Sequence, residues 1–177
     1  MKIMLAGNKG CGKDTAADFL VSQYGGLQFS FAGPLYDIMY FYQDTMKVER
    51  HKDRVFLQTI GSLARQKNPD VWVNLCLRKA WEHPKENIYI TDGRYFNELE
   101  AGKDDGFYIV HVVSNNSVRQ ERRPNESIED SHPSENGYPA DYEFDFTVEN
   151  NGTVEELYDA LETVVAEIIK KESHVIY

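Results

Sequence analysis

The chain carries Gly7-Asn8-Lys9-Gly10-Cys11-Gly12-Lys13-Asp14-Thr15 directly after six mostly apolar residues, Met1 to Ala6. The apolar run suits a buried strand, and Lys13 to Tyr24 repeats apolar residues at helical spacing. A glycine loop between a strand and a helix favours phosphate binding, because its backbone N–H groups and the helix N-terminus attract anions. An ordinary glycine turn is the alternative. The context predicts a loop for a nucleoside triphosphate, with the Lys13 ammonium reaching the β- and γ-phosphates.

One position of this loop departs from the common phosphate-loop pattern. Asp14 stands where Ser or Thr usually follows the lysine, and the hydroxyl comes one residue later, at Thr15. Whether Asp14 or Thr15 contacts Mg²⁺ is therefore left open. Asp92, at the end of a predicted strand, is a further Mg²⁺ candidate through water, with helix capping as its alternative role. We expect ATP and Mg²⁺ as cofactors.

Length and charge limit the classes of protein that fit. The 177 residues suit one domain, and the net charge of −10 disfavours nucleic acid and anionic membranes as partners. The two cysteines, Cys11 and Cys76, make no disulfide framework, which favours a reducing compartment. We find no run long enough to span a bilayer and, with a core strand at the start, expect no signal peptide. We expect a cytoplasmic protein, in the host cytoplasm if the gene belongs to a phage.

Strand and helix patterns alternate along the chain. Besides the first strand and helix, we expect strands at Leu27–Ala32, Asn87–Thr91, Phe107–Val113 and Phe144–Val148. We expect further helices at Pro34–Asp44, His51–Gln66, Asp70–His83 and Thr153–Glu172. Five strands that alternate with helices predict an α/β fold, a five-stranded parallel sheet with helices on both faces.

Ligands of such sheets lie beyond the carboxyl ends of the strands. This rule selects Asp92 and Arg94, and the segments Gly33–Asp37, Ser114–Arg123 and Glu149–Gly152, as neighbours of the glycine loop. Residues 114–143 are too long for a simple connector, and we interpret them as an arginine-containing lid.

Arg119, Arg122 and Arg123 give this segment a concentrated positive charge within an acidic chain. A guanidinium fork matches phosphate geometry, which favours anion binding. The alternative is a solvated helix face on which these arginines pair with Glu121 and Glu126. Phosphoryl transfer needs positioned charge more than a covalent group, so lysine, arginines, Mg²⁺ and loop amides suffice. The five histidines lack metal-ligand spacing, and His111 suits a core position.

The chain resembles the deoxynucleoside monophosphate kinases of bacteriophages, a branch of the P-loop nucleoside monophosphate kinases. The matching motifs are G-x-K-x-x-G-K-D-T-x-A-D-F at 7–19, A-G-P-x-x-D at 32–37, L-Q-x-x-G with a W-V pair at 57–73, D-x-R-x-x-x-E at 92–98, H-V-V at 111–113, H-x-x-E-x-G-x-P at 132–139 and N-x-G-x-x-E-E-L at 150–157. The resemblance implies transfer of the ATP γ-phosphoryl group to a deoxynucleoside 5′-monophosphate on a P-loop kinase sheet.

The resemblance also implies roles for individual residues. It places ATP on Gly10, Cys11, Gly12, Lys13, Asp14, Thr15, Asn150 and Asn151, the two asparagines touching adenine. It places catalytic charge on Lys13, Arg94, Arg119 and Arg123. The acceptor nucleotide would contact Lys9, Tyr36, Asp37, Trp72, Asp92, Arg94 and Glu98. We add Arg65 for the acceptor phosphate on charge alone, a helix-surface role being its alternative. Tyr36 replaces a lysine common in the family, which leaves base specificity open.

Arg94 and Glu98 lie four positions apart, so we expect both on one face of a helix, addressing the acceptor. Two other functions stay open. One is a small-molecule kinase of the phosphomevalonate or dephospho-coenzyme A type, which would not require a nucleobase. The other is a nonenzymatic ATP-sensing module, which would release no ADP. The preferred base, the sugar and a homodimeric state are left open.

Overall fold

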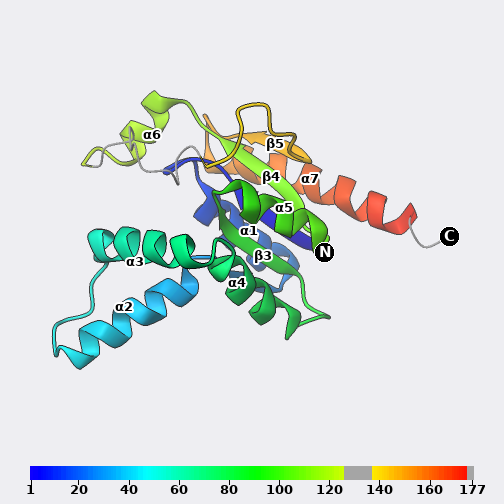
Figure 1. The fold of residues 1–177 in the computed structure, drawn as a ribbon. Helices are drawn as coiled ribbons and strands as arrows, with labels where there is room; N and C mark the ends of the chain where they lie inside the picture. The colour runs from blue at the N-terminus through cyan, green and yellow to red at the C-terminus, as the bar shows by residue number, and fades with distance from the viewer. Residues whose placement is uncertain (126–136, 175–177) are drawn as a thin grey trace. The chain divides into compact units, whose positions relative to one another are not determined.

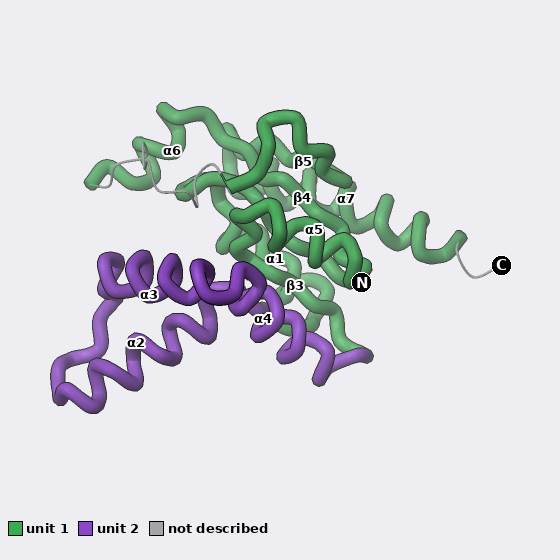
Figure 2. The backbone as a smooth tube through the Cα atoms, in the orientation of Figure 1, with its two compact units in different colours: residues 1–28, 85–177 green, residues 29–84 purple. Residues whose placement is uncertain are grey.

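The computed structural model describes residues 1–125 and 137–174. The chain divides into two compact units, coloured separately in Figure 2. Unit 1 contains residues 1–28 and 85–177, and unit 2 contains residues 29–84. Each unit is described by itself below.

A five-stranded parallel sheet forms the centre of unit 1 (Figure 1). Its strands are β1 (Lys2–Ala6), β2 (Leu27–Phe29), β3 (Ile88–Gly93), β4 (Tyr108–Val113) and β5 (Phe146–Glu149). Their order across the sheet is β2-β3-β1-β4-β5, and β1 pairs in parallel with both β3 and β4. The predicted fold class is confirmed. Because β1 is central and buried on both faces, its carboxyl end, where the glycine loop begins, lies at the middle of the ligand edge.

Helices cover both faces of this sheet. They are α1 (Lys13–Tyr24), α5 (Phe96–Asp104) and α7 (Val154–His174). The short helix α6 (Asn116–Arg122) follows β4 beyond the carboxyl edge of the sheet (Figure 1). Alternate strand residues point to opposite faces. Leu5 and Val112 therefore join α1 and α7 in one core cluster. The opposite face belongs to α5, where Gly102 lies against Met4 and Ile109.

Most predicted elements of unit 1 are present, with shifted ends. The strand predicted at Leu27–Ala32 ends at Phe29, and the last strand begins at Phe146 instead of Phe144. The third strand runs on to Gly93, so Asp92 lies inside β3 instead of just beyond it. A capping box sets the start of α7. The Thr153 N–H donates to the Glu156 carboxylate, and the Glu156 N–H donates to the Thr153 hydroxyl.

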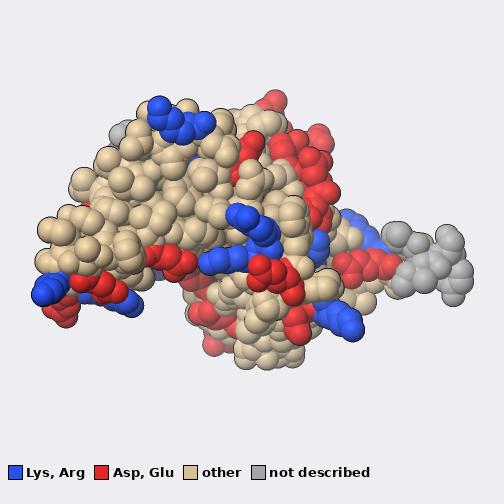
Figure 3. Space-filling view, turned by 60° about the horizontal axis from the view of Figure 1, so that its bottom comes forward, with Lys and Arg blue, Asp and Glu red and all other residues tan. Residues whose placement is uncertain are grey.

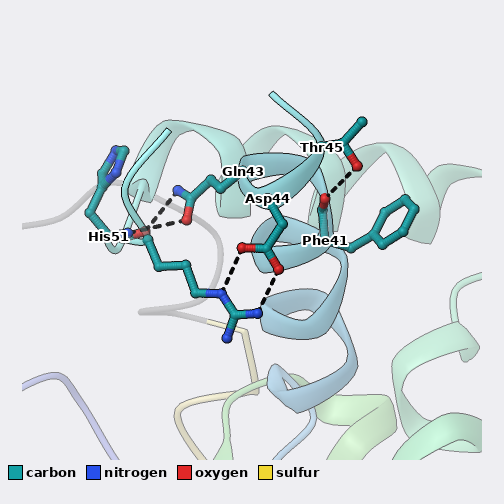
Figure 4. A network of polar contacts seen from close by, with 6 residues as sticks. Phe41, Gln43, Asp44, Thr45 and His51 are labelled. Atoms are coloured by element: carbon teal, nitrogen blue, oxygen red, sulfur yellow. Dashed lines mark hydrogen bonds and ion pairs between the residues drawn. The ribbon is translucent and has the colours of Figure 1, made fainter. Parts of the chain in front are cut away.

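Unit 2 contains three helices, α2 (Gly33–Thr45), α3 (Arg54–Lys67) and α4 (Val71–Trp81), with α2 in contact with both others. The helix predicted from His51 begins at Arg54 because Asp53 caps it, accepting a hydrogen bond from the Phe56 N–H. The connection between α2 and α3 is held to the end of α2 (Figure 4). Gln43 makes two hydrogen bonds with the backbone of His51.

The exterior of the molecule carries mixed charge. Figure 3 shows one face on which acidic and basic side chains are interspersed among uncharged residues. Exposed pairs such as Arg50–Asp44 and Lys79–Asp37 contribute little stability because solvent screens them. Within residues 1–125 and 137–174, none of the helices combines the length and apolarity needed to cross a membrane.

Candidate active site

The glycine loop joins the end of β1 to the start of α1. Gly7, Gly10 and Gly12 have φ angles of +138°, +80° and +102°, a region that side chains with a Cβ rarely adopt. Three left-handed positions in six residues curl the backbone tightly before α1 begins. The predicted loop is therefore formed, with its last glycine directly before the helix N-terminus.

Lys13 is buried against the carbonyl groups of this loop. Its Nζ donates hydrogen bonds to the Gly7 oxygen at 2.7 Å and the Asn8 oxygen at 3.0 Å. Burial lowers the pKa of the Lys13 ammonium below its ordinary value, and the positive charge of Arg94 lowers this pKa further. Arg94 is thus close enough to Lys13 for their charges to interact.

Arg119 of α6 lies inside the structure. Only 5% of the residue is exposed, so the predicted alternative of a solvated arginine is wrong at this position. Its Nη1 donates to the backbone oxygen of Lys9 at 3.1 Å, and its Nη2 donates to Asn116 at 2.7 Å. Arg119 therefore supports the backbone of the phosphate loop.

Arg123 follows α6, and its side chain passes close to Gly10 of the same loop. A Cβ on Gly10 would lie 3.4 Å from Cδ of Arg123 and 3.6 Å from Cβ of Arg119. The absence of a side chain at Gly10 lets the arginine stems approach the backbone closely. Lys13, Arg94 and Arg123 thus bring positive charge to one loop of an acidic protein.

Asn150 connects the end of β5 to the loop from the other side. Its Nδ2 donates to the Cys11 oxygen at 2.9 Å and lies directly against Gly12, where a Cβ would collide with it. Its Oδ1 accepts a hydrogen bond from Nη2 of Arg122 at 3.1 Å. The two asparagines expected at adenine both bond to the protein, since Asn151 accepts from the Asn115 N–H at 2.7 Å, at the start of α6.

Arg122 is the site residue that our sequence reasoning did not select. The sequence marked it only as one of three clustered arginines. Its partner Asn150 is 28 positions away along the chain, and no spacing rule links the two residues. The N-x-G motif at 150–152 and the neighbouring arginines were the available signals.

The expectation that Arg94 and Glu98 share a helical face is wrong. The helix α5 begins at Phe96, because β3 extends to Gly93 and Tyr95 is the N-cap. Glu98 is buried, and its Oε2 accepts hydrogen bonds from the N–H groups of Arg94 (2.9 Å) and Tyr95 (3.0 Å). The carboxylate therefore fixes the first turn of α5 and the backbone at Arg94.

Asp92 lies at the carboxyl end of β3, at the ligand edge of the sheet. Gly93, the next residue, is in register with Ala6 at the end of β1. Asp14 is exposed and Thr15 half-buried in the first turn of α1. Among the described residues, no three His, Cys, Asp or Glu side chains gather into a metal-binding group.

The remaining residues predicted for the acceptor lie in unit 2. Trp72 is buried and donates from Nε1 to the Gly61 oxygen at 3.2 Å, so it packs α4 against α3. Tyr36 lies beside Lys52, whose Nζ is 5.7 Å from the ring centre, and Asp37 makes an exposed ion pair with Lys79. The acceptor roles of these residues and of Arg65 stay predictions.

Solved structures share the fold, and two of the three described here are named as kinases. TT1252 from Thermus thermophilus superposes with a TM-score of 0.62 at 20% identity, covering 94% of this chain and 97% of that protein. A gluconokinase from Sinorhizobium meliloti 1021 gives a TM-score of 0.58 at 13% identity, covering 99% and 97%. A shikimate kinase from Aquifex aeolicus gives 0.56 at 14% identity, covering 97% and 98%. At these identities the likeness shows the α/β kinase fold alone.

Sequence comparisons are more specific. A protein of Acanthamoeba polyphaga mimivirus, provisionally named a deoxynucleotide monophosphate kinase, is 28% identical over 90% of this chain and 93% of its own length. The uncharacterized protein ORF77 of Ictalurid herpesvirus 1 is 32% identical over 56% of this chain and 44% of its own. The family model for deoxynucleotide monophosphate kinases matches residues 49–161. Since that match takes in Asp92, Arg94, Arg123 and Asn150 at the ligand edge, and covers most of the chain, this protein belongs to the deoxynucleotide monophosphate kinase family and is a nucleotide phosphotransferase.

Proposed function

We propose that this enzyme transfers the γ-phosphoryl group of ATP to the 5′-phosphate of a deoxynucleoside monophosphate. The observation that carries the proposal is the convergence of Lys13, Arg94 and Arg123 on one glycine loop at the carboxyl edge of the sheet. Cationic groups at this place suit the transition state of phosphoryl transfer, whose negative charge is spread over the phosphoryl oxygens.

The reaction needs no general base in this scheme. An oxygen of the acceptor phosphate is already anionic, and it forms the new bond to the γ-phosphorus of ATP. The bond between the γ-phosphorus and the β,γ-bridging oxygen breaks, leaving ADP and a deoxynucleoside diphosphate. The contribution of the protein is to align the two anions and stabilise the charge that moves between them.

Lys13 and Arg123 are the residues we place on the transferring phosphoryl group. Lys13 reaches it by exchanging its bonds to the Gly7 and Asn8 carbonyls for phosphate oxygens. Arg123 is placed here because its side chain passes beside Gly10 of the loop. Arg119 is assigned a supporting role, since its Nη1 and Nη2 atoms donate to Lys9 and Asn116. Arg94 and Lys9 are assigned to the acceptor phosphate.

Mg²⁺ fits the oxygen donors available at the loop. The Thr15 hydroxyl and the carboxylates of Asp14 and Asp92 are hard ligands, and Mg²⁺ commonly combines one or two such groups with substrate phosphates and water. These residues would hold the ion beside the ATP phosphates, where it supplies charge neutralisation. This arrangement needs no cage made by the protein alone.

Other parts of the earlier interpretation stay predictions. They are the single domain of residues 1–177, the lid at about 114–143, the adenine contacts, a homodimer, the exclusion of nucleic-acid partners and a cytoplasmic location. Part of the H-x-x-E-x-G-x-P motif at 132–139 lies outside the described residues.

A coupled assay for ADP release tests the proposal. The purified enzyme is supplied with ATP, Mg²⁺ and, one at a time, each common or modified ribo- and deoxyribonucleoside monophosphate. We expect ADP release that depends on the acceptor and formation of the matching diphosphate. ADP release with phosphorylated non-nucleotide acceptors alone, or with none, would contradict the proposed reaction. Lys13→Ala serves as the inactive control.

A further inference from the structure

Two backbone carbonyl groups of the phosphate loop are held by side chains from later in the chain. Arg119 donates to the Lys9 oxygen at 3.1 Å, and Asn150 donates to the Cys11 oxygen at 2.9 Å. Both donors are at least nine-tenths buried, with 5% of each residue exposed. These bonds join α6 and the end of β5 to the loop that precedes α1.

Holding these carbonyls also orients the amides needed for phosphate. In a planar trans peptide the C=O and the following N–H point in opposite directions. The Lys9 carbonyl therefore determines the direction of the Gly10 N–H, and the Cys11 carbonyl determines that of the Gly12 N–H. These N–H groups belong to the glycine loop that we assign to ATP.

The orientation of the Asn150 amide depends in turn on Arg122. Its Nη1 donates to the backbone oxygen of Asn150 and its Nη2 donates to the side-chain Oδ1, both at 3.1 Å. Ser114 also donates to the Asn150 backbone oxygen, at 2.7 Å. With Oδ1 turned to the guanidinium, Nδ2 is the atom that faces Cys11. The guanidinium of arginine holds two donors at a fixed separation, which suits simultaneous hydrogen bonds to the two oxygens of Asn150.

We propose that Arg122 is a positioning residue for nucleotide binding. Through Asn150 it holds the Cys11 carbonyl and so keeps the Gly12 N–H turned toward the ATP phosphates. Arg122 itself touches no phosphate in this arrangement. The inference rests on the proposed function only in taking ATP as the ligand of the loop.

The competing role for Arg122 is a direct contact with phosphate. The two roles differ in what they require of the side chain. A direct contact requires positive charge, which lysine also supplies, whereas holding Asn150 requires two donors at fixed separation. The variant Arg122→Lys therefore separates them while keeping the charge and most of the side chain.

The experiment compares ATP affinity, by calorimetry, for the wild type, Arg122→Ala, Arg122→Lys, Asn150→Ala and the double variant. The exposed Arg78 of α4, changed to Ala, is the matched control. We expect the dissociation constant for ATP to rise roughly tenfold in Arg122→Ala, because a bond that orients the loop is lost. Arg122→Lys should lose most of the same affinity. The double variant should bind ATP no more weakly than Asn150→Ala, since both changes break one chain of contacts.

Two results would overturn the inference. One is ATP affinity close to that of the wild type in Arg122→Lys, which indicates a simple charge effect. The other is full additivity of the two alanine substitutions. A fold defect alone reduces the active fraction and so lowers kcat, whereas the proposed effect raises KM for ATP and leaves kcat at saturating ATP nearly unchanged.

Calorimetry with ATP requires no acceptor, so this inference and the proposed function fail separately. If the wild type phosphorylates no nucleoside monophosphate but Arg122→Ala binds ATP more weakly, the inference holds and the proposed reaction is wrong. If the wild type is active and all the variants bind ATP normally, the inference is wrong and the reaction holds.

Discussion

The ammonium of Lys13 lies 2.7 Å from the backbone oxygen of Gly7, inside the loop that begins with that glycine. The ammonium of Lys13 therefore hydrogen-bonds to backbone carbonyl groups of the loop to which it belongs. Burial lowers the pKa of this ammonium, so a phosphate oxygen that replaces a carbonyl would favour the charged form. This relationship motivates the first prediction.

Lys13→Ala should lower turnover by on the order of 10²-fold or more, because the variant lacks the charge placed on the transferring phosphoryl group. The rate is measured by coupled ADP release at saturating substrates. Lys170→Ala, which changes an exposed lysine of α7, is the control and should leave the rate unchanged. Near-normal turnover in Lys13→Ala would refute the role of this lysine.

Arg123→Ala should reduce kcat by roughly tenfold or more with a smaller effect on ATP affinity, because its contact strengthens as charge develops in transfer. Arg119→Ala should instead lower ATP affinity more than kcat, because the Arg119 side chain holds the Lys9 carbonyl of the loop. Steady-state kinetics and ATP titration of both variants measure the difference. Identical patterns in the two variants would contradict the distinction.

Arg94→Ala should weaken acceptor binding by roughly 1.5–3 kcal/mol, the value of a hydrogen bond to a charged group, and change ATP affinity little. Separate titrations with ATP and with the preferred monophosphate measure the two affinities. Loss of ATP affinity with acceptor binding intact would mean that the two nucleotides are assigned the wrong way round.

Glu98→Gln should destabilise the fold by about 1–2 kcal/mol, because a charged acceptor of two backbone N–H bonds at the start of α5 becomes neutral. Urea unfolding measures the change, with Glu167→Gln on the exposed side of α7 as the control. This revises the role in base recognition that the sequence suggested. A reordered preference among bases at unchanged stability would restore that earlier role.

Stability should fall as the pH drops below about 6.5, in part through His111. Burial lowers the pKa of this imidazole, whose ring stacks on Phe144 at 4.0 Å between centroids. In the interval between its folded pKa and about 6.5, the unfolded chain binds a proton that the folded protein does not, so acid favours unfolding.

The variant His111→Phe should therefore flatten the dependence of the unfolding free energy on pH in this interval. Urea unfolding at a series of pH values gives the slopes. His174→Gln, which changes an exposed histidine, should keep the slope of the wild type. Equal slopes in the wild type and His111→Phe would exclude a contribution from His111.

The sequence by itself determined the sheet, the loop and the family. An apolar run before three glycines and a lysine specifies strand, turn and helix through local backbone preferences, and Gly7 to Lys13 adopt that arrangement. Apolar strand segments alternate with helical segments along the chain, and this alternation predicted a parallel sheet. Neighbouring parallel strands need a crossover connection, which is usually a helix packed on a face of the sheet. These are properties of neighbouring residues, so they can be read along the chain.

Only the tertiary structure decided which polar side chains face the loop and which hold it. Glu98 looked like a ligand residue four positions from Arg94, but it is buried and accepts hydrogen bonds from the backbone at the start of α5. Arg122 donates to Asn150, and Asn150 donates to Cys11, because β4, β5 and the loop meet at one edge of the sheet. The Arg122–Asn150 bond joins residues 28 positions apart, and the Asn150–Cys11 bond joins residues 139 positions apart. Both bonds depend on how distant segments pack together, which local sequence preferences do not specify.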